Sequence, residues 1–219
     1  MREGRFIGPA LAGALALTLG VSPQTLGSGA ARGASFDCAR AASPTEIAIC
    51  SDPALSGLDG QLGTAYAQRL ALDPALRQIQ RAWLRARDAG CGRDRACLRR
   101  FMTAQLAWLR GGSARPPSRI PTTEGACSLT AVARVESRLE GAPGSGSAVA
   151  ETNGAYQVSY DTIPAIQRSR PGDPTLLCLV SIPKGCPPGD DRGRIYAGAN
   201  LRTLGAWSEA DAEHMCGGA

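Results

Sequence analysis

The sequence predicts an α+β protein: a disulfide-tied antiparallel helical hairpin or small bundle, followed by a small disulfide-rich β domain. The first observation is a change of period, because apolar residues recur at every third or fourth position before residue 110 and at every second position after residue 127. The second is a Gly/Pro-rich stretch that divides eight cysteines into two groups of four. The third is composition, since 43% of the 219 residues are hydrophobic but only 5% are aromatic. A core with so few large side chains depends on its cross-links.

Residues 1–34 are typical of a secretory signal peptide. Arg2 and Arg5 give a positive start, an apolar stretch covers residues 7–21, and small residues crowd positions 27–34. The apolar stretch is short for a membrane span, and an uncleaved anchor is the alternative interpretation. We therefore expect a periplasmic or secreted protein with no membrane insertion after the signal is cleaved.

The cysteines agree with export. All eight follow the leader, and an even number of cysteines in an exported chain implies disulfides. Free thiols or a zinc site are the alternatives, but zinc sites usually contain a Cys-x-x-Cys pair, which this sequence lacks. The eight residues are Cys38, Cys50, Cys91, Cys97, Cys127, Cys178, Cys186 and Cys216.

Residues 111–126 are predicted to be a linker. Three Pro and two Gly within 111–121 disfavour both helix and strand. The chain then divides into the signal peptide, a helical domain at 35–110, this linker and a small β-rich domain at 127–219. We expect the two domains to fold separately.

Start signals and apolar stripes predict the helical domain. Ser43 precedes a proline and, three residues on, Glu46, which is a capping-box pattern. Asp52 and Asp73 each precede a proline that opens a further helix, and a turn at 90–94 comes before the last one. Apolar residues recur at intervals of three and four between these signals, so each helix has one apolar face.

Alternation predicts the β domain. Residues 156–160 alternate apolar and polar side chains, and Asn153-Gly154 before them is a strong hairpin signal. Residues 208–211 predict one helical turn near the end of the chain. Further strands are expected at 176–182, 194–197 and 202–207.

The charged residues point to no reaction. All but one of the 24 basic residues are arginine, and a net charge of +5 without a basic run does not indicate a nucleic-acid partner. The single histidine, His214, excludes metal sites that need two or more histidines. Glu136 and Glu140 lie four residues apart, but we interpret them as a solvated face rather than a catalytic pair. We expect no enzymatic activity, no cofactor and no metal.

The helical domain resembles a known family. The motifs that carry the resemblance are the run from Ser35 to Cys50 and the pairs Leu58-Asp59, Trp83-Leu84, Arg87-Asp88 and Cys97-Leu98. Over about residues 36–110 these motifs resemble the LprI-type lysozyme-inhibitor family. The resemblance implies a disulfide-tied helical hairpin and a protein partner such as lysozyme. Gly90, an extra residue before Cys91, departs from the family pattern.

Hairpin geometry predicts the disulfides. The helix after Asp52 runs away from Cys50 and the next helix returns, which brings Cys91 beside Cys50 and leaves Cys97 within reach of Cys38. Four cysteines allow three pairings, so the other pairings stay open. The predicted set is Cys38–Cys97, Cys50–Cys91, Cys127–Cys178 and Cys186–Cys216.

These observations give one leading hypothesis for the function: an exported bacterial protein that binds and blocks lysozyme or a related muramidase by occlusion. The alternative is a non-inhibitory periplasmic module for a cell-envelope partner. Tyr66, Trp83 and Arg87 form the candidate recognition face, and core packing is the other interpretation of the same residues. The charge of the helical domain disfavours it as the face that binds lysozyme. Residues 38–110 contain 11 basic and 6 acidic side chains, and common lysozymes are also cationic.

Overall fold

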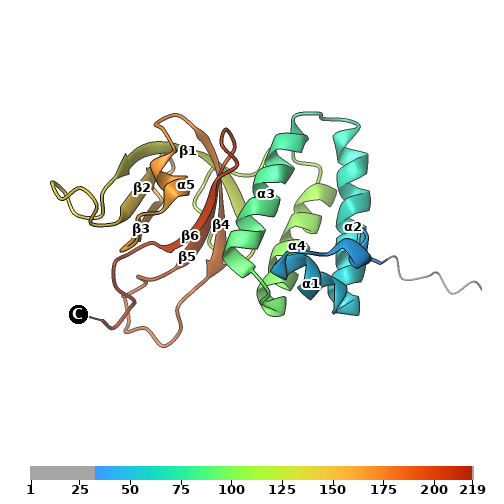
Figure 1. The fold of residues 1–219 in the computed structure, drawn as a ribbon, viewed down its shortest axis with the longest axis horizontal. Coiled ribbons are helices and arrows are strands. Elements are labelled where there is room, and N and C mark those ends of the chain that lie inside the picture. Colours follow the sequence, from blue (N-terminus) through green and yellow to red (C-terminus); the bar gives the residue numbers. More distant parts are fainter. Residues whose placement is uncertain (1–32, 219) are drawn as a thin grey trace, which may run out of the picture. The chain divides into compact units, whose positions relative to one another are not determined.

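The computed structural model describes residues 33–218, which belong to one compact unit (Figure 1). Four helices precede six strands in these residues, and the predicted α+β class is confirmed. The predicted signal peptide lies outside the described residues except for its last two positions. Within residues 33–218, the structure contains no helix whose length and hydropathy would allow it to cross a membrane.

Side-chain caps mark the starts of α1, α2 and α4, whereas α3 begins without one. A short 3-10 helix at Cys38–Arg40 precedes α1 (Pro44–Cys50), α2 (Pro53–Leu70), α3 (Leu76–Cys91) and α4 (Arg95–Arg110). The predicted capping box is present: the Glu46 N–H donates to Ser43 Oγ, and the Ser43 N–H donates to the Glu46 carboxylate. Asp52 and Asp94 each accept two backbone N–H groups at the starts of α2 and α4. These contacts satisfy donors that a helix start otherwise leaves without partners.

All eight cysteines form disulfides, but two of the four predicted pairings are wrong. The helical half contains Cys38–Cys50 and Cys91–Cys97, with Cα–Cα distances of 5.7 and 5.4 Å. The predicted pairs Cys38–Cys97 and Cys50–Cys91 are wrong because each actual bond closes a local turn. The chain before α1 folds back on the end of α1, and the turn between α3 and α4 is tight. The pairs Cys127–Cys178 and Cys186–Cys216 are confirmed.

The second half is a closed antiparallel barrel with the strand order β1-β2-β3-β6-β5-β4. Its elements are β1 (Cys127–Glu136), β2 (Ser147–Glu151), β3 (Tyr156–Ser159), α5 (Pro164–Gln167), β4 (Pro174–Ser181), β5 (Ile195–Asn200) and β6 (Ala206–Ala210). The helical turn predicted at 208–211 is wrong, because Ser208 and Glu209 pair with β5 and close the barrel. Backbone pairing there overrides the local capping pattern.

A tryptophan fills the barrel between β5 and β6. Trp207 lies against Gly198, and a Cβ at that glycine would overlap the indole ring. The indole N–H of Trp207 donates to Gln157 at 2.9 Å, and the Gln157 amide donates to the Tyr196 carbonyl at 2.7 Å. The indole ring of Trp207 therefore fits because residue 198 is glycine and because the indole N–H has a hydrogen-bond acceptor.

The helices and the barrel share one core. Helix α3 packs against β4, β5 and β6, and its buried residues join those of the strands in a single apolar cluster (Figure 1). The cluster includes Leu55, Trp83, Phe101, Leu176, Val180 and Ala197. Separate folding of two domains does not follow from this arrangement, although no disulfide joins the two halves.

The stretch predicted as a linker is held in place at its end. Gly125 has a φ of +85°, and its N–H donates to the Leu179 carbonyl at 2.8 Å. A Cβ at Gly125 would lie 2.6 Å from the Arg100 carbonyl oxygen, so the chain crosses α4 in close contact. Arg100 also pairs with Glu124 at 2.9 Å. The Gly/Pro composition therefore permits a close crossing between α4 and the barrel.

A close approach of α3 to the barrel, at Gly90, yields a stability prediction. A Cβ at Gly90 would lie 2.7 Å from Val180 Cγ2 and 3.0 Å from Ala197 Cβ. Gly90→Ala should therefore lower the free energy of unfolding by about 1 to 2 kcal/mol, since two packed layers must move apart. Gly57→Ala is the matched control in α2, where a new Cβ meets nothing within 4 Å.

Urea unfolding of both variants checks this prediction. The control should gain about 0.5 to 1 kcal/mol, because alanine restricts the unfolded chain and favours helix. A gain in stability for Gly90→Ala equal to that of the control would contradict the close packing of α3 on the barrel.

Candidate functional site

The residues predicted as a recognition face lie mostly inside the protein. Trp83 is 1% exposed and Arg87 is 5% exposed. The Arg87 guanidinium lies 5.3 Å from the centre of the Trp83 ring, so the structure brings these two side chains together on α3. Tyr66 packs against the core from α2 and is only partly buried. This placement fits core packing and leaves little of Trp83 or Arg87 for a partner to contact.

Arg87 ties α3 to α2 and to the start of the described chain. Its guanidinium donates to Asp88 at 2.9 and 3.0 Å, and it lies 4.0 Å from the buried carboxylate of Asp59. The same Asp59 accepts hydrogen bonds from the Ser35 N–H at 2.7 Å and from Ser35 Oγ at 2.5 Å. The Leu58-Asp59 and Arg87-Asp88 motifs therefore hold helices together.

The carboxylates of the helical half all have intramolecular partners. Four aspartates and one glutamate accept backbone N–H groups at turns and helix starts, and the remaining two lie beside Arg87. The five are Asp37, Glu46, Asp52, Asp73 and Asp94. Hydrogen bonds from the backbone of Ser43 and Ala42 lower the pKa of Glu46. Residues 38–110 contain 11 basic and 6 acidic side chains, so the helical half carries a net positive charge.

A surface at α1 remains open to a partner. Ile47 is 53% exposed beside a hollow of about 400 Å³ that Pro44 and Arg95 also line. We call this region, with Ala48, Ser51 and Arg93, the α1 surface. The sequence analysis did not predict this surface. Ile47 could have indicated it, since Ile47 is an apolar residue outside the face of α1 that buries Ile49.

The α1 surface has a rigid frame. The Cys38–Cys50 and Cys91–Cys97 disulfides lie at the ends of the helices that border it. The Thr45 hydroxyl donates to the Gly92 carbonyl at 2.8 Å, and Arg95 donates to Ser51 Oγ at 3.1 Å. A preformed apolar surface loses little conformational entropy on binding, which favours a protein partner.

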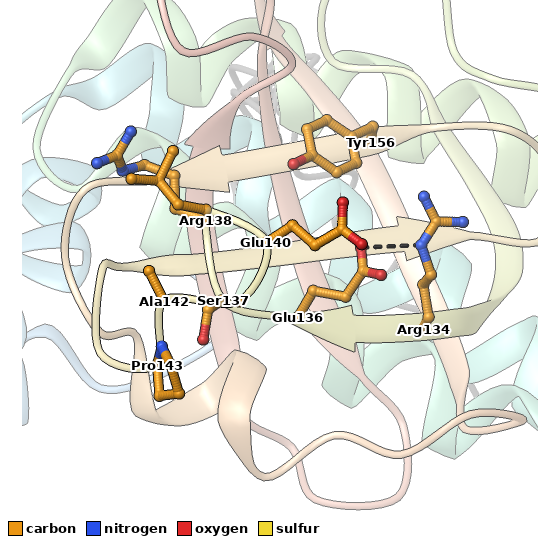
Figure 2. Close-up of a pocket in the computed structure, with 10 residues that line it drawn as sticks. Arg134, Glu136, Ser137, Arg138, Glu140, Ala142, Pro143 and Tyr156 are labelled. Atoms are coloured by element: carbon orange, nitrogen blue, oxygen red, sulfur yellow. Dashed lines mark hydrogen bonds and ion pairs between the residues drawn. The ribbon is translucent and has the colours of Figure 1, made fainter.

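A second hollow, of about 570 Å³, lies beneath the loop that follows β1 (Figure 2). Glu136 and Glu140 both line it, so the structure places the two carboxylates together on a strand end and loop rather than on a helix face. Arg134 pairs with Glu136 at 2.8 Å, and Tyr156 forms a further wall. The Arg134 pairing gives Glu136 a structural role at the rim of the hollow.

Arg138 fastens this loop to the barrel. Its guanidinium lies 4.3 Å from the Tyr160 ring and 3.1 Å from Glu213, and it donates to the Ser145 carbonyl at 2.9 Å. In residues 33–218, no cluster of three or more His, Cys, Asp or Glu side chains is placed to hold a metal ion.

The protein is a disulfide-bonded helical bundle packed against an antiparallel barrel. Residues 38–120 match the family model described as lysozyme inhibitor LprI, which confirms the resemblance of the helical segment. The lipoproteins LprI of Mycobacterium tuberculosis and Mycobacterium bovis are 38% identical over 104 residues, covering 42% of this chain and 52% of theirs. The chain thus spans about half the length of the curated relatives it matches. No solved structure matches it.

The buried arginine yields a second stability prediction. Arg87→Met should lower the free energy of unfolding by about 3 kcal/mol, because Asp59 would keep its buried charge without a cation nearby. Arg85→Met is the control, since Arg85 is exposed on the same helix and its loss should change stability by less than about 0.5 kcal/mol. Thermal and urea unfolding of the two variants measure the difference. Equal stability of both variants would show that Arg87 does not hold α2 and α3 together.

A buried glutamate at the end of β2 predicts a pH effect. Glu151 is 3% exposed, and neither carboxylate oxygen has a hydrogen-bond partner among the described residues. Burial raises the pKa of Glu151 from 4.5 to about 7. The folded protein then retains the proton that the unfolded chain loses, so stability should fall as pH rises from about 4.5 to 7 and then level off.

Glu151→Gln tests this effect. The variant carries no ionisable group there, so above pH 7 it should be more stable than the unmodified protein by about 3 kcal/mol, and the two should converge below pH 5. Urea unfolding across this pH range measures the difference. Glu140→Gln, on the exposed loop, is the control and should keep the unmodified pH profile. A constant difference between Glu151→Gln and the unmodified protein would rule out titration of Glu151.

Proposed function

We propose that this protein is an exported inhibitor that binds lysozyme or a related muramidase and blocks it by occlusion. The observation that carries the proposal is the match of residues 38–120 to the lysozyme-inhibitor family model. The disulfides support export, because such bonds persist in oxidising compartments. The mycobacterial relatives are named lipoproteins, which agrees with a periplasmic or secreted location.

The α1 surface is the binding face that we propose. It lies within the family match and contains the exposed side chain of Ile47 together with Arg93 and Arg95. An exposed apolar side chain on a rigid base is the kind of anchor that carries binding energy. Arg93 and Arg95 slow the approach of a cationic enzyme, but charge affects the association rate more than the final affinity.

Inhibition of a cationic lysozyme acting on a cell-wall suspension tests the proposal. Ile47→Glu should raise the concentration needed for half-inhibition by about tenfold, since it removes the anchor and adds a charge that binding must desolvate. Leu72→Glu is the matched control, because Leu72 is 82% exposed at the turn after α2 and lies outside the α1 surface. Its potency should change by less than about twofold.

Two results would count against the proposal. Equal losses for both variants would move the binding face away from α1. An unmodified protein that neither inhibits nor binds lysozyme would overturn the inhibitor function and leave the non-inhibitory envelope module as the account.

A further inference from the structure

A groove runs along α3 where the helix meets the loop between β5 and β6. It consists of two adjoining hollows of about 500 and 360 Å³ that share Arg81 and Leu204. Arg85 lines the first hollow and Arg77 the second. We call this feature the α3 groove. One wall comes from the segment that matches the lysozyme-inhibitor family, and the other comes from the barrel, which lies outside that match.

The α3 wall of the groove carries a row of three arginines. Arg77, Arg81 and Arg85 recur at every fourth residue, so they lie on one face of the helix and about 6 Å apart along its axis. All three are exposed, and no carboxylate in residues 33–218 forms an ion pair with them. Like charges at this spacing repel one another, which weakens the helix unless an anion offsets them.

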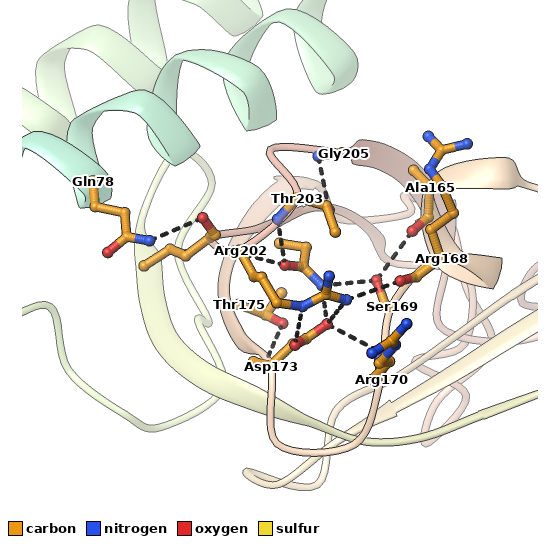
Figure 3. Close-up of polar contacts among 12 residues, drawn as sticks. Gln78, Ala165, Arg168, Ser169, Arg170, Asp173, Thr175, Arg202, Thr203 and Gly205 are labelled. Carbon is orange, nitrogen blue, oxygen red and sulfur yellow. Dashed lines mark hydrogen bonds and ion pairs between the residues drawn. The ribbon is translucent and has the colours of Figure 1, made fainter.

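The opposite wall is rigid. Arg202 donates to both carboxylate oxygens of Asp173, at 2.6 and 2.7 Å, and this pairing holds the pKa of Asp173 well below its usual range (Figure 3). The Gln78 amide donates to the Leu201 carbonyl at 3.0 Å, which joins the loop to α3. Leu204 has a φ of +55°, a conformation that these contacts hold in place. The wall is thus preformed, and its own arginine is already neutralised.

Three carboxylates also line the first hollow, but none of them forms an ion pair with the row. Asp59 and Asp88 pair with Arg87, and Glu46 accepts hydrogen bonds from the backbone of Ala42 and Ser43. These carboxylates offset part of the positive charge at the first hollow, whereas no carboxylate lines the second hollow.

We propose that the α3 groove binds a linear acidic polysaccharide. Guanidinium groups suit the planar carboxylates of such a polymer, which they can contact through two hydrogen bonds each. A row of repeated cations fits a ligand with repeated anions, and two open hollows in line fit a chain better than a small ion. The exposed side chain of Leu84 and the partly exposed Leu204 supply apolar contact for sugar rings.

The same observations disfavour other anionic partners. Nucleic-acid grooves use exposed aromatic side chains to stack bases, and the one aromatic side chain in the two hollows, Phe36, packs against the core. Arginine is also common at protein interfaces, but the buried core of such an interface is depleted of charge, whereas three arginines stand in a row along this groove.

Binding of the full chain to polygalacturonate oligomers, measured by calorimetry, tests the proposal, with neutral dextran as the uncharged polymer. A triple variant, Arg77→Gln, Arg81→Gln and Arg85→Gln, should bind at least about tenfold more weakly, and the salt dependence of its binding should be shallower by about three charges. The control triple, Arg40→Gln, Arg115→Gln and Arg119→Gln, removes the same net charge from exposed sites outside both the groove and the α1 surface and should change affinity by less than about twofold.

Three results would overturn the proposal: equal weakening by both triple variants, no binding of polygalacturonate by the unmodified chain, or equally tight groove-dependent binding of single-stranded DNA. Lysozyme inhibition by the groove variant separates this proposal from the proposed function. Retained inhibition together with lost polysaccharide binding supports two independent surfaces. Loss of both with a native circular dichroism spectrum contradicts that independence.

Discussion

The packing of α3 against the barrel is the constraint on which the rest of the structure depends. Trp83 on this helix is buried in the core that the helices and strands share, and Gly90, two turns further on, contacts β4 and β5. Leu176 and Val180 of β4 belong to the same apolar cluster as the buried residues of the helices. A chain with so few aromatic residues gains its core by joining two thin layers into one.

The sequence predicted elements better than their assembly. Local chemistry fixes a helix start, so Ser43 and Asp52 predicted theirs correctly. The pairing of Cys38 depends on how the chain before α1 folds back, which no periodicity records. A signal for the shared core was present, because residues 176–180 form an unbroken apolar run, which is typical of a strand covered on both faces. The composition of 111–121 predicted two separately folding domains, and their independent folding stays a prediction.

The same contrast holds for the candidate surfaces. The motif residues that carry the family likeness include Trp83 and Arg87, and they build the interior of the fold. The sequence motifs therefore predicted the match to the family model of residues 38–120, but they did not indicate an exposed surface. Residues outside the apolar stripe supply the open surfaces: Ile47 on α1 and the arginines on the exposed side of α3. The barrel side of the α3 groove could not be predicted, because residues 201–204 reach α3 only through the tertiary fold.

Hydrogen exchange measured peptide by peptide under native conditions, with urea added in small steps, tests the shared core most directly. If α3 and the barrel form one core, the slowest amides of α2, α3, β4 and β5 should open with the same free energy and the same dependence on urea. Helical peptides that open at a clearly lower free energy, while β4 and β5 stay protected up to global unfolding, would show two independent domains and contradict this account.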